Sequence, residues 1–243
     1  MATNVAAHVL EARELVVRYG GVTALQRVGL RVASDEVVGL IGPNGAGKTS
    51  FLNAVSGVAV PSAGSILLDE REIGGLPSHR IARAGVVRTY QNVRLFRTLS
   101  IEENVRAGSF AARRPISVAG IDGVLRQTAL DEVDRFAQAG RLPYGAQRRL
   151  EIARALASAP CILLLDEPAA GLNPEETAQL GRLVRAIARG GVGVLLVEHD
   201  MQLVNDICDR VAVLNFGTVI AQGSPAEIAR DPAVIEAYLG TPR

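Results

Sequence analysis

Short apolar runs alternate with longer segments of helical spacing along most of the chain. The runs are rich in valine, isoleucine and leucine and are bounded by turn residues or charges, which predicts buried strands. The expected strands cover residues 14–19, 37–41, 65–68, 86–89, 161–165, 192–197 and 210–214. The expected helices cover residues 48–56, 77–83, 144–158, 174–189 and 200–207. This alternation predicts an α/β fold in which helices cover both faces of a parallel sheet.

The middle of the chain interrupts that alternation. Ser100 and Glu103 form the pattern of a capping box, which predicts the start of a helix. Further helical patterns continue to Gln138. We therefore expect a small helical subdomain inserted into an α/β core. The expected parts are a core of residues 1–91 and 159–243 and a helical subdomain of residues 92–158, within a single domain of residues 1–243.

Composition narrows the class of protein. The chain has 243 residues, of which 48% are hydrophobic and 21% are charged, with a formal net charge of +1, as in ordinary globular proteins. Arginines are scattered rather than gathered on one face, which argues against a nucleic-acid partner. No stretch approaches the roughly 20 apolar residues of a membrane helix, and the N-terminus does not resemble a signal peptide. Two cysteines are too few for a disulfide framework, so buried thiols are expected.

The chain contains 25 arginines and a single lysine, Lys48. In so arginine-rich a background, a lysine is expected to persist where a guanidinium does not fit. A compact ammonium suits a tight phosphate site better than the wide planar fork of arginine. The alternative is that this lysine persists by chance on a solvated face, and the motif around Lys48 disfavours that alternative.

A glycine-rich motif surrounds this lysine, between a predicted strand and a predicted helix. It fits the phosphate-binding pattern G-x-x-x-x-G-K-[ST], in which backbone N–H groups and a helix N-terminus surround phosphates. The pattern predicts that Lys48 reaches the β- and γ-phosphates of a nucleotide and that the Thr49 hydroxyl binds Mg²⁺. The candidate nucleotide-binding residues here are Gly42, Pro43, Asn44, Gly45, Ala46, Gly47, Lys48, Thr49 and Ser50. A glycine-rich turn without a ligand is the alternative, and the flanking strand and helix disfavour it.

Two carboxylates end the apolar run that begins at residue 161. Asp166 at the end of a strand beside the phosphate loop is placed to hold Mg²⁺. Glu167 follows it and is a candidate general base toward the water beyond the γ-phosphate. A solvated strand end would show the same pattern, but the distance from the phosphate loop favours the catalytic interpretation.

These elements, in this order, resemble an ATP-binding cassette (ABC) ATPase along nearly the whole chain. Tyr19 matches the aromatic residue that stacks on adenine in that family. Gln91 matches the glutamine that contacts Mg²⁺ and the attacking water, and His199 matches the histidine that contacts the γ-phosphate. Each of these three residues, taken alone, would more simply have a structural role. Together they imply an ATPase that uses ATP and Mg²⁺, with antiparallel N-terminal strands beside a P-loop NTPase core.

The family signature Leu-Ser-Gly-Gly-Gln corresponds to Leu-Pro-Tyr-Gly-Ala at residues 142–146. Pro143 replaces its serine, Tyr144 its first glycine and Ala146 its glutamine, while Gly145 is kept as a candidate contact to nucleotide. Proline suits the first turn of a helix, so we expect the following helix to form. Asn173 stands where many relatives carry an aspartate.

The departures resemble one group within the family, the ATP-binding subunits of branched-chain (hydrophobic) amino acid importers. Residues 92–96, 142–145, 169–174 and 237–240 carry this resemblance. It implies a peripheral protein at the cytoplasmic face of the membrane. The implied partners are a second ABC ATPase subunit, transmembrane permeases and, indirectly, a periplasmic-type binding protein. For the ATPase partner, a heterodimer is expected and a homodimer is the alternative.

Other functions stay open at this point. Urea, short amides or an exported lipid are alternative substrates, because substrate contacts belong to other chains. A soluble ABC protein in repair or translation is a second alternative, although relatives of that kind usually carry two cassettes or a long coiled coil. A nucleotide kinase or GTPase would not explain the signature-like helix or His199.

Overall fold

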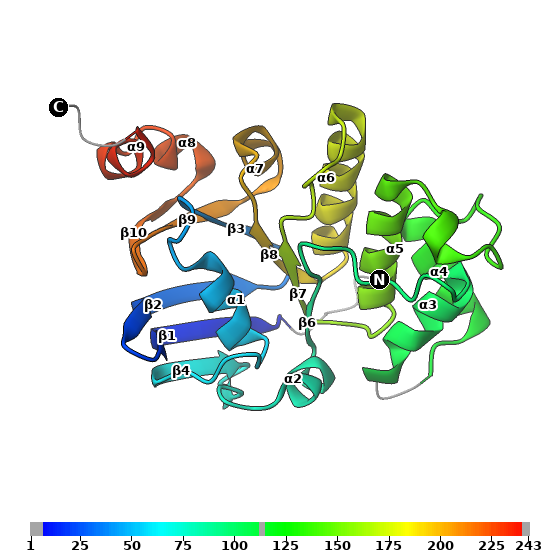
Figure 1. Ribbon diagram of the computed structural model, residues 1–243, viewed down its shortest axis with the longest axis horizontal. Helices are drawn as coiled ribbons and strands as arrows, with labels where there is room; N and C mark the ends of the chain where they lie inside the picture. Colours follow the sequence, from blue (N-terminus) through cyan, green and yellow to red (C-terminus); the bar gives the residue numbers. More distant parts are fainter. Residues whose placement is uncertain (1–6, 112–114, 240–243) are drawn as a thin grey trace.

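The computed structural model describes residues 7–111 and 115–239 of the chain. Within that part, the strands form two sheets, and a separate group of helices stands beside them (Figure 1). The six-stranded sheet has the order β10-β9-β3-β8-β7-β6, and the four-stranded sheet has the order β2-β1-β4-β5. The expected class, an α/β P-loop core with antiparallel N-terminal strands and a helical subdomain, is confirmed.

The six-stranded sheet is parallel except at one edge, where β10 runs antiparallel to β9. Its central strands β3, β7 and β8 are buried at every position, which explains why they were recognisable as continuous apolar runs. The strands of this sheet are β3 (Val37–Ile41), β6 (Val86–Arg88), β7 (Ile162–Asp166), β8 (Gly193–Val197), β9 (Arg210–Asn215) and β10 (Thr218–Gly223).

The four-stranded sheet is antiparallel throughout. Its long strands alternate buried and exposed side chains, as in β2, where Val28, Leu30 and Val32 point inward. Its strands are β1 (Val9–Tyr19), β2 (Val22–Ala33), β4 (Ala63–Leu68) and β5 (Arg71–Glu72). The sequence prediction began β1 five residues late and gave no separate bounds for β2 or β10.

Helices fill the space between the sheets and cover the outer face of the parallel sheet. Helix α1 (Lys48–Val55) packs Phe51 and Leu52 into the core shared by both sheets. Helices α6 (Pro174–Arg189) and α7 (Met201–Ile207) cover the opposite face of the parallel sheet. Successive side chains along the central strands therefore pack alternately into two different cores. The shorter helices of the core are α2 (Ser78–Ala84), α8 (Pro225–Ile228) and α9 (Pro232–Leu239).

The helical subdomain has its own core, built on helices that lie at one end of the sheet (Figure 1). It contains α3 (Ile101–Gly108), α4 (Val118–Gln127) and the first part of α5 (Tyr144–Leu156), with short 3₁₀ turns at Ser109–Ala111 and Ala139–Arg141. The predicted capping box at Ser100 and Glu103 is present. The second half of α5 packs into the core of the parallel sheet, so this helix joins the two parts.

One helix was predicted too long. Helical patterns were expected to continue to Gln138, but α4 ends at Gln127. Ala129 adopts a positive φ of 52°, which ends the helix. The chain then returns beside residues 97–102 and hydrogen-bonds to their backbone, for example from Ala139 N to Leu99 O at 2.9 Å. Tertiary pairing therefore overrides the helical pattern here.

No helix in the described part of the chain is both long enough and apolar enough to cross a membrane.

Candidate nucleotide-binding site

The glycine-rich loop joins the end of β3 to the N-terminus of α1. Gly42 and Gly47 have φ values of 147° and 110°, which side-chain-bearing residues rarely adopt. A Cβ atom at Gly42 would lie 2.0 Å from the carbonyl oxygen of Leu214, so neighbouring backbone also requires glycine there. No side chain caps the first N–H groups of α1. These donors are therefore available to an anion at the helix N-terminus.

Lys48 points back into the loop that precedes it. Its Nζ atom donates to the carbonyl oxygens of Gly42 at 2.6 Å and Pro43 at 3.0 Å, and the residue is 6% exposed. Burial lowers the pKa of Lys48, and the carboxylates of Glu167 and Asp166 oppose that shift. The lone lysine of the chain thus occupies a tight site within the predicted motif.

A pocket of about 510 Å³ opens over this loop. Residues Asn44 to Ser50 of the phosphate loop line it, together with Glu167 and His199. The other lining residues come from β2 and from the hairpin between β9 and β10. They are Val22, Thr23, Ala24, Gln26, Phe216 and Gly217.

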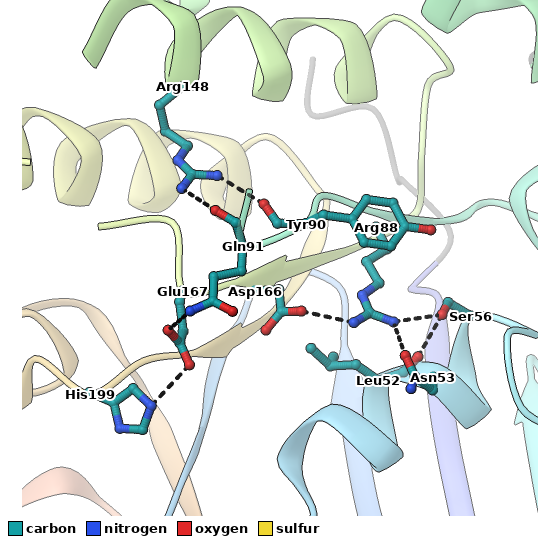
Figure 2. A network of polar contacts seen from close by, with 10 residues as sticks. All are labelled: Leu52, Asn53, Ser56, Arg88, Tyr90, Gln91, Arg148, Asp166, Glu167 and His199. Atoms are coloured by element: carbon teal, nitrogen blue, oxygen red, sulfur yellow. Dashed lines mark hydrogen bonds and ion pairs between the residues drawn. The ribbon is translucent and has the colours of Figure 1, made fainter. Parts of the chain in front are cut away.

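Glu167 lies at the centre of the predicted catalytic group (Figure 2). One carboxylate oxygen accepts from Gln91 Nε2 at 2.7 Å, and the other lies 2.9 Å from His199 Nε2. The three residues come from distant parts of the chain, yet the structure brings them together. Glu167 also has a positive φ of 46°, a strained conformation of the kind found at functional sites.

Asp166 is buried at the end of β7 and does not line the pocket. Its Oδ2 atom accepts a hydrogen bond from Arg88 Nη2 at 2.8 Å. Thr49 lies in the first turn of α1 and lines the pocket. A hydroxyl, an amide oxygen and a carboxylate are hard oxygen donors, and this chemistry suits Mg²⁺.

The signature-like segment opens α5. Pro143 is the N-cap of this helix, with Tyr144 as its first residue, so the proline lies one position before the expected first turn. Pro143 has a ψ of 152°, as N-cap residues do, and its side chain offers no capping oxygen. Gly145 packs against Glu176, because a Cβ atom there would lie 2.4 Å from the glutamate Oε1.

The predicted adenine contact, Tyr19, lies at the end of β1 and is 47% exposed. It precedes the Gly20-Gly21 turn that leads to the pocket-lining residues of β2, but it does not itself line the pocket. Phe216 does line it and is 81% exposed. Phe216 was missed in the sequence because an aromatic residue in an Asn-Phe-Gly turn carries no signal of its own.

Comparison with known families decides the class of protein. A family model described as ABC transporter matches residues 25–170, and a second, described as branched-chain amino acid ATP-binding cassette transporter, matches residues 218–243. The chain belongs to the ABC transporter ATP-binding family. The resemblance to ABC ATPases and to their branched-chain amino acid subunits, predicted from the sequence, is confirmed.

The similarity to known relatives extends over almost the whole chain. The high-affinity branched-chain amino acid transport ATP-binding protein BraF of Pseudomonas aeruginosa is 46% identical over 96% of this chain and 98% of its own. The corresponding protein LivG of Escherichia coli is 43% identical over 95% of this chain and 97% of its own. A nucleotide-free ATP-binding cassette from an ABC transporter matches with a TM-score of 0.87 and 25% identity, over 96% of this chain and all of that one.

Two buried side chains that sequence reasoning missed hold in place the loops that carry Gln91 and His199. Arg148 on α5 donates to the carbonyl oxygens of Tyr90 and Gln91 at 2.9 and 2.6 Å, which fixes the start of the loop that carries Gln91 (Figure 2). Glu198 accepts from the backbone N–H groups of Ala169 and His199 at 2.7 and 3.1 Å. Burial raises the pKa of Glu198.

The two cysteines have no part in this site. Cys208 is buried and Cys161 half-buried, and burial raises the pKa of their thiols to about 12 and about 11. The sequence prediction of buried thiols is confirmed for Cys208, whereas Cys161 is only half-buried.

Proposed function

We propose that this cassette is the ATP-hydrolysing motor of an importer for branched-chain amino acids. The observation that carries the substrate class is the match of residues 218–243 to the branched-chain family model, supported by relatives whose names specify the same transport. The nucleotide pocket supports the motor role, because the phosphate loop, Glu167 and His199 line one space, and Glu167 and His199 are in contact there.

Mg²⁺ fits the residues around the pocket as a partner of ATP. Thr49, Gln91 and Asp166 would hold it, and it would supply positive charge against the phosphates. Within the described residues there is no group of three or more histidine, cysteine, aspartate or glutamate side chains arranged for a metal. A magnesium ion held by few protein oxygens and by substrate phosphates has this pattern.

The proposed roles of Lys48, Glu167, Gln91 and His199 follow from their positions, and those of Tyr19 and Gly145 follow from the family resemblance. Lys48 and the free N–H groups of α1 bind the phosphates, and Tyr19 stacks on the adenine. Glu167 accepts a proton from the attacking water, while Gln91 and His199 fix the direction of its carboxylate. Gly145 and its neighbours on α5 face the nucleotide of a second subunit.

We also propose where the partners bind. Two cassettes enclose two ATP molecules, each between one phosphate loop and the other subunit's α5. Permease subunits dock on the helical subdomain, where Phe96 and Phe136 are 52% and 74% exposed on adjacent, hydrogen-bonded segments. The cassette then works at the cytoplasmic face of the membrane, and a periplasmic-type binding protein delivers substrate to the permeases.

Substrate uptake tests the proposed importer. Cells that lack this cassette should lose at least about 90% of high-affinity leucine, isoleucine and valine uptake, since hydrolysis drives the transport step. Wild-type protein should restore it, and Lys48→Ala at the same expression level should not. Radiolabelled uptake at low substrate concentration measures this.

The same assay separates the alternatives. Urea and a short amide serve as control substrates whose uptake should be unchanged. A lipopolysaccharide export system ATP-binding protein of Acidithiobacillus ferridurans is 38% identical, so outer-membrane integrity is measured in parallel. Loss of urea uptake or of lipid export with leucine uptake intact would contradict the proposed substrate.

The altered signature predicts a slow ATPase when this chain is alone. A serine hydroxyl at position 143 would donate to a phosphate across the dimer, and Pro143 has neither hydroxyl nor N–H to donate. The loss is about one charge-assisted hydrogen bond, worth roughly 1.5–3 kcal/mol. Pro143→Ser should therefore raise the ATPase rate of the isolated chain by about 10- to 100-fold. A partner cassette with an intact signature should activate the wild-type chain similarly.

The structure indicates which variants this experiment needs. Pro143→Ala removes the proline without adding a hydroxyl and is the matched control. Ala146 is 7% exposed in the core of the helical subdomain, so Ala146→Gln, the other change toward the family signature, would crowd that core and belongs in a separate variant. An isolated wild-type chain as fast as Pro143→Ser would refute the idea of an impaired signature.

A further inference from the structure

Arg88 is a buried cation in contact with the carboxylate assigned to magnesium (Figure 2). It ends β6, and its side chain is 5% exposed. Nη2 donates to Asp166 Oδ2 at 2.8 Å, and Nη1 donates to Asn53 Oδ1 at 2.8 Å and Ser56 Oγ at 3.1 Å. The Arg88 guanidinium also lies 5.0 Å from the ring centre of Tyr90, the residue before Gln91.

The ion pair joins three parts of the site. Asp166 belongs to the strand that carries Glu167, and Asn53 and Ser56 lie at the end of α1, the helix that begins in the phosphate loop. β6 leads directly into the segment with Gln91. Arg88 therefore fixes the Asp166 carboxylate relative to both the phosphate loop and the Gln91 loop.

The contact between Arg88 and Asp166 also has an electrostatic effect on the magnesium site. The Asp166 side chain is 10% exposed, and a buried carboxylate without a partner is strongly destabilising. Mg²⁺ needs the negative charge of the same carboxylate. A guanidinium hydrogen-bonded to that group reduces the potential felt by the ion and repels it directly, because both are cations.

We propose that Arg88 is a positioning residue that acts as the built-in counter-ion of Asp166 and competes with Mg²⁺ for its negative charge. It keeps the carboxylate paired and oriented between turnovers, and it weakens Mg²⁺ binding so that the ion leaves with the product. The inference rests on the assignment of Asp166 to magnesium proposed above, and its test separates the two.

Nucleotide affinity with and without Mg²⁺ provides the first test. The dissociation constant of a non-hydrolysable ATP analogue is measured in EDTA and in Mg²⁺, and the ratio of the two reports the Mg²⁺ contribution. Arg88→Met keeps the length but removes the charge, and the ratio should rise about tenfold through loss of cation repulsion. Arg88→Lys keeps the charge and should stay within about threefold of the wild-type ratio.

Two controls define the outcome. Arg154→Met removes another partly buried guanidinium of this region, one that stacks on Phe96 at 5.6 Å, and should leave the ratio unchanged. Asp166→Asn should reduce the ratio toward one, and if it does not, the magnesium assignment fails rather than the role of Arg88. A ratio for Arg88→Met that is unchanged or lower, with a normal effect of Asp166→Asn, would overturn the proposal.

Thermal unfolding without nucleotide and Mg²⁺ gives an independent readout. Arg88→Met should lower the Tm by about 5–15 °C, because Asp166 loses its counter-charge. Adding Asp166→Asn to that variant should recover at least half of the loss, since the buried charge is then gone. No recovery in the double variant would show that Arg88 acts only through packing. The Tm comparison remains readable even where the single variant binds nucleotide poorly.

Discussion

Glu167→Gln is expected to bind ATP normally and to lose about 10²–10⁴-fold in turnover. The amide preserves the local structure, because its oxygen accepts from Gln91 and its NH₂ group faces His199. The change removes only the ability to take a proton from water. Steady-state phosphate release measures the rate, and sizing in ATP and Mg²⁺ should show a nucleotide-bound dimer that accumulates because hydrolysis no longer separates it.

An exposed acid provides the matched control for this variant. Glu132 lies on the surface of the helical subdomain, and Glu132→Gln should leave the ATPase rate within twofold of wild type. Glu167 would not be the base if Glu167→Gln hydrolysed ATP at the wild-type rate and remained monomeric in ATP. Loss of ATP binding, in contrast, would point to a structural role at the strained position.

The sequence signals for this candidate site are local. The phosphate loop lies within nine consecutive residues between a strand and a helix, and Asp166 and Glu167 directly follow a continuous apolar strand. Backbone geometry then completes what the motif implies, since glycines at 42 and 47 adopt φ values that other residues avoid. Tyr19, Gln91 and His199 needed the family resemblance, because each alone is ambiguous.

Features formed by residues far apart in the sequence could not be predicted from the sequence. Arg88 and Asp166 are 78 positions apart, and one arginine among 25 gives no indication of its partner. Phe216 enters the pocket only because a hairpin turn is held against the phosphate loop, with Gly217 N bonded to Ala46 O at 2.8 Å. The prediction of helix up to Gln138 was wrong for the same reason. Backbone groups near Gln138 pair instead with residues 97–102.

Lys48→Arg is expected to behave almost like Lys48→Ala despite the retained charge. The Lys48 ammonium is enclosed by the carbonyl oxygens of Gly42 and Pro43, and a planar guanidinium is too wide for that space. Lysine contacts to phosphate are charge-assisted hydrogen bonds, worth roughly 1.5–3 kcal/mol each. Loss of about two of them should weaken ATP binding or slow turnover by about 10²–10⁴-fold in both variants.

The control for this prediction is an arginine-to-lysine exchange on the surface. Arg230 is exposed, and Arg230→Lys should leave the ATPase rate unchanged, which separates the effect of site shape from that of residue type. ATP affinity by equilibrium binding and steady-state phosphate release are measured for all three variants, with the Tm of each as a check of folding. Near-normal turnover by a folded Lys48→Arg protein would show that charge alone suffices at this position. The survival of a single lysine among 25 arginines would then have no explanation in the geometry of the phosphate loop.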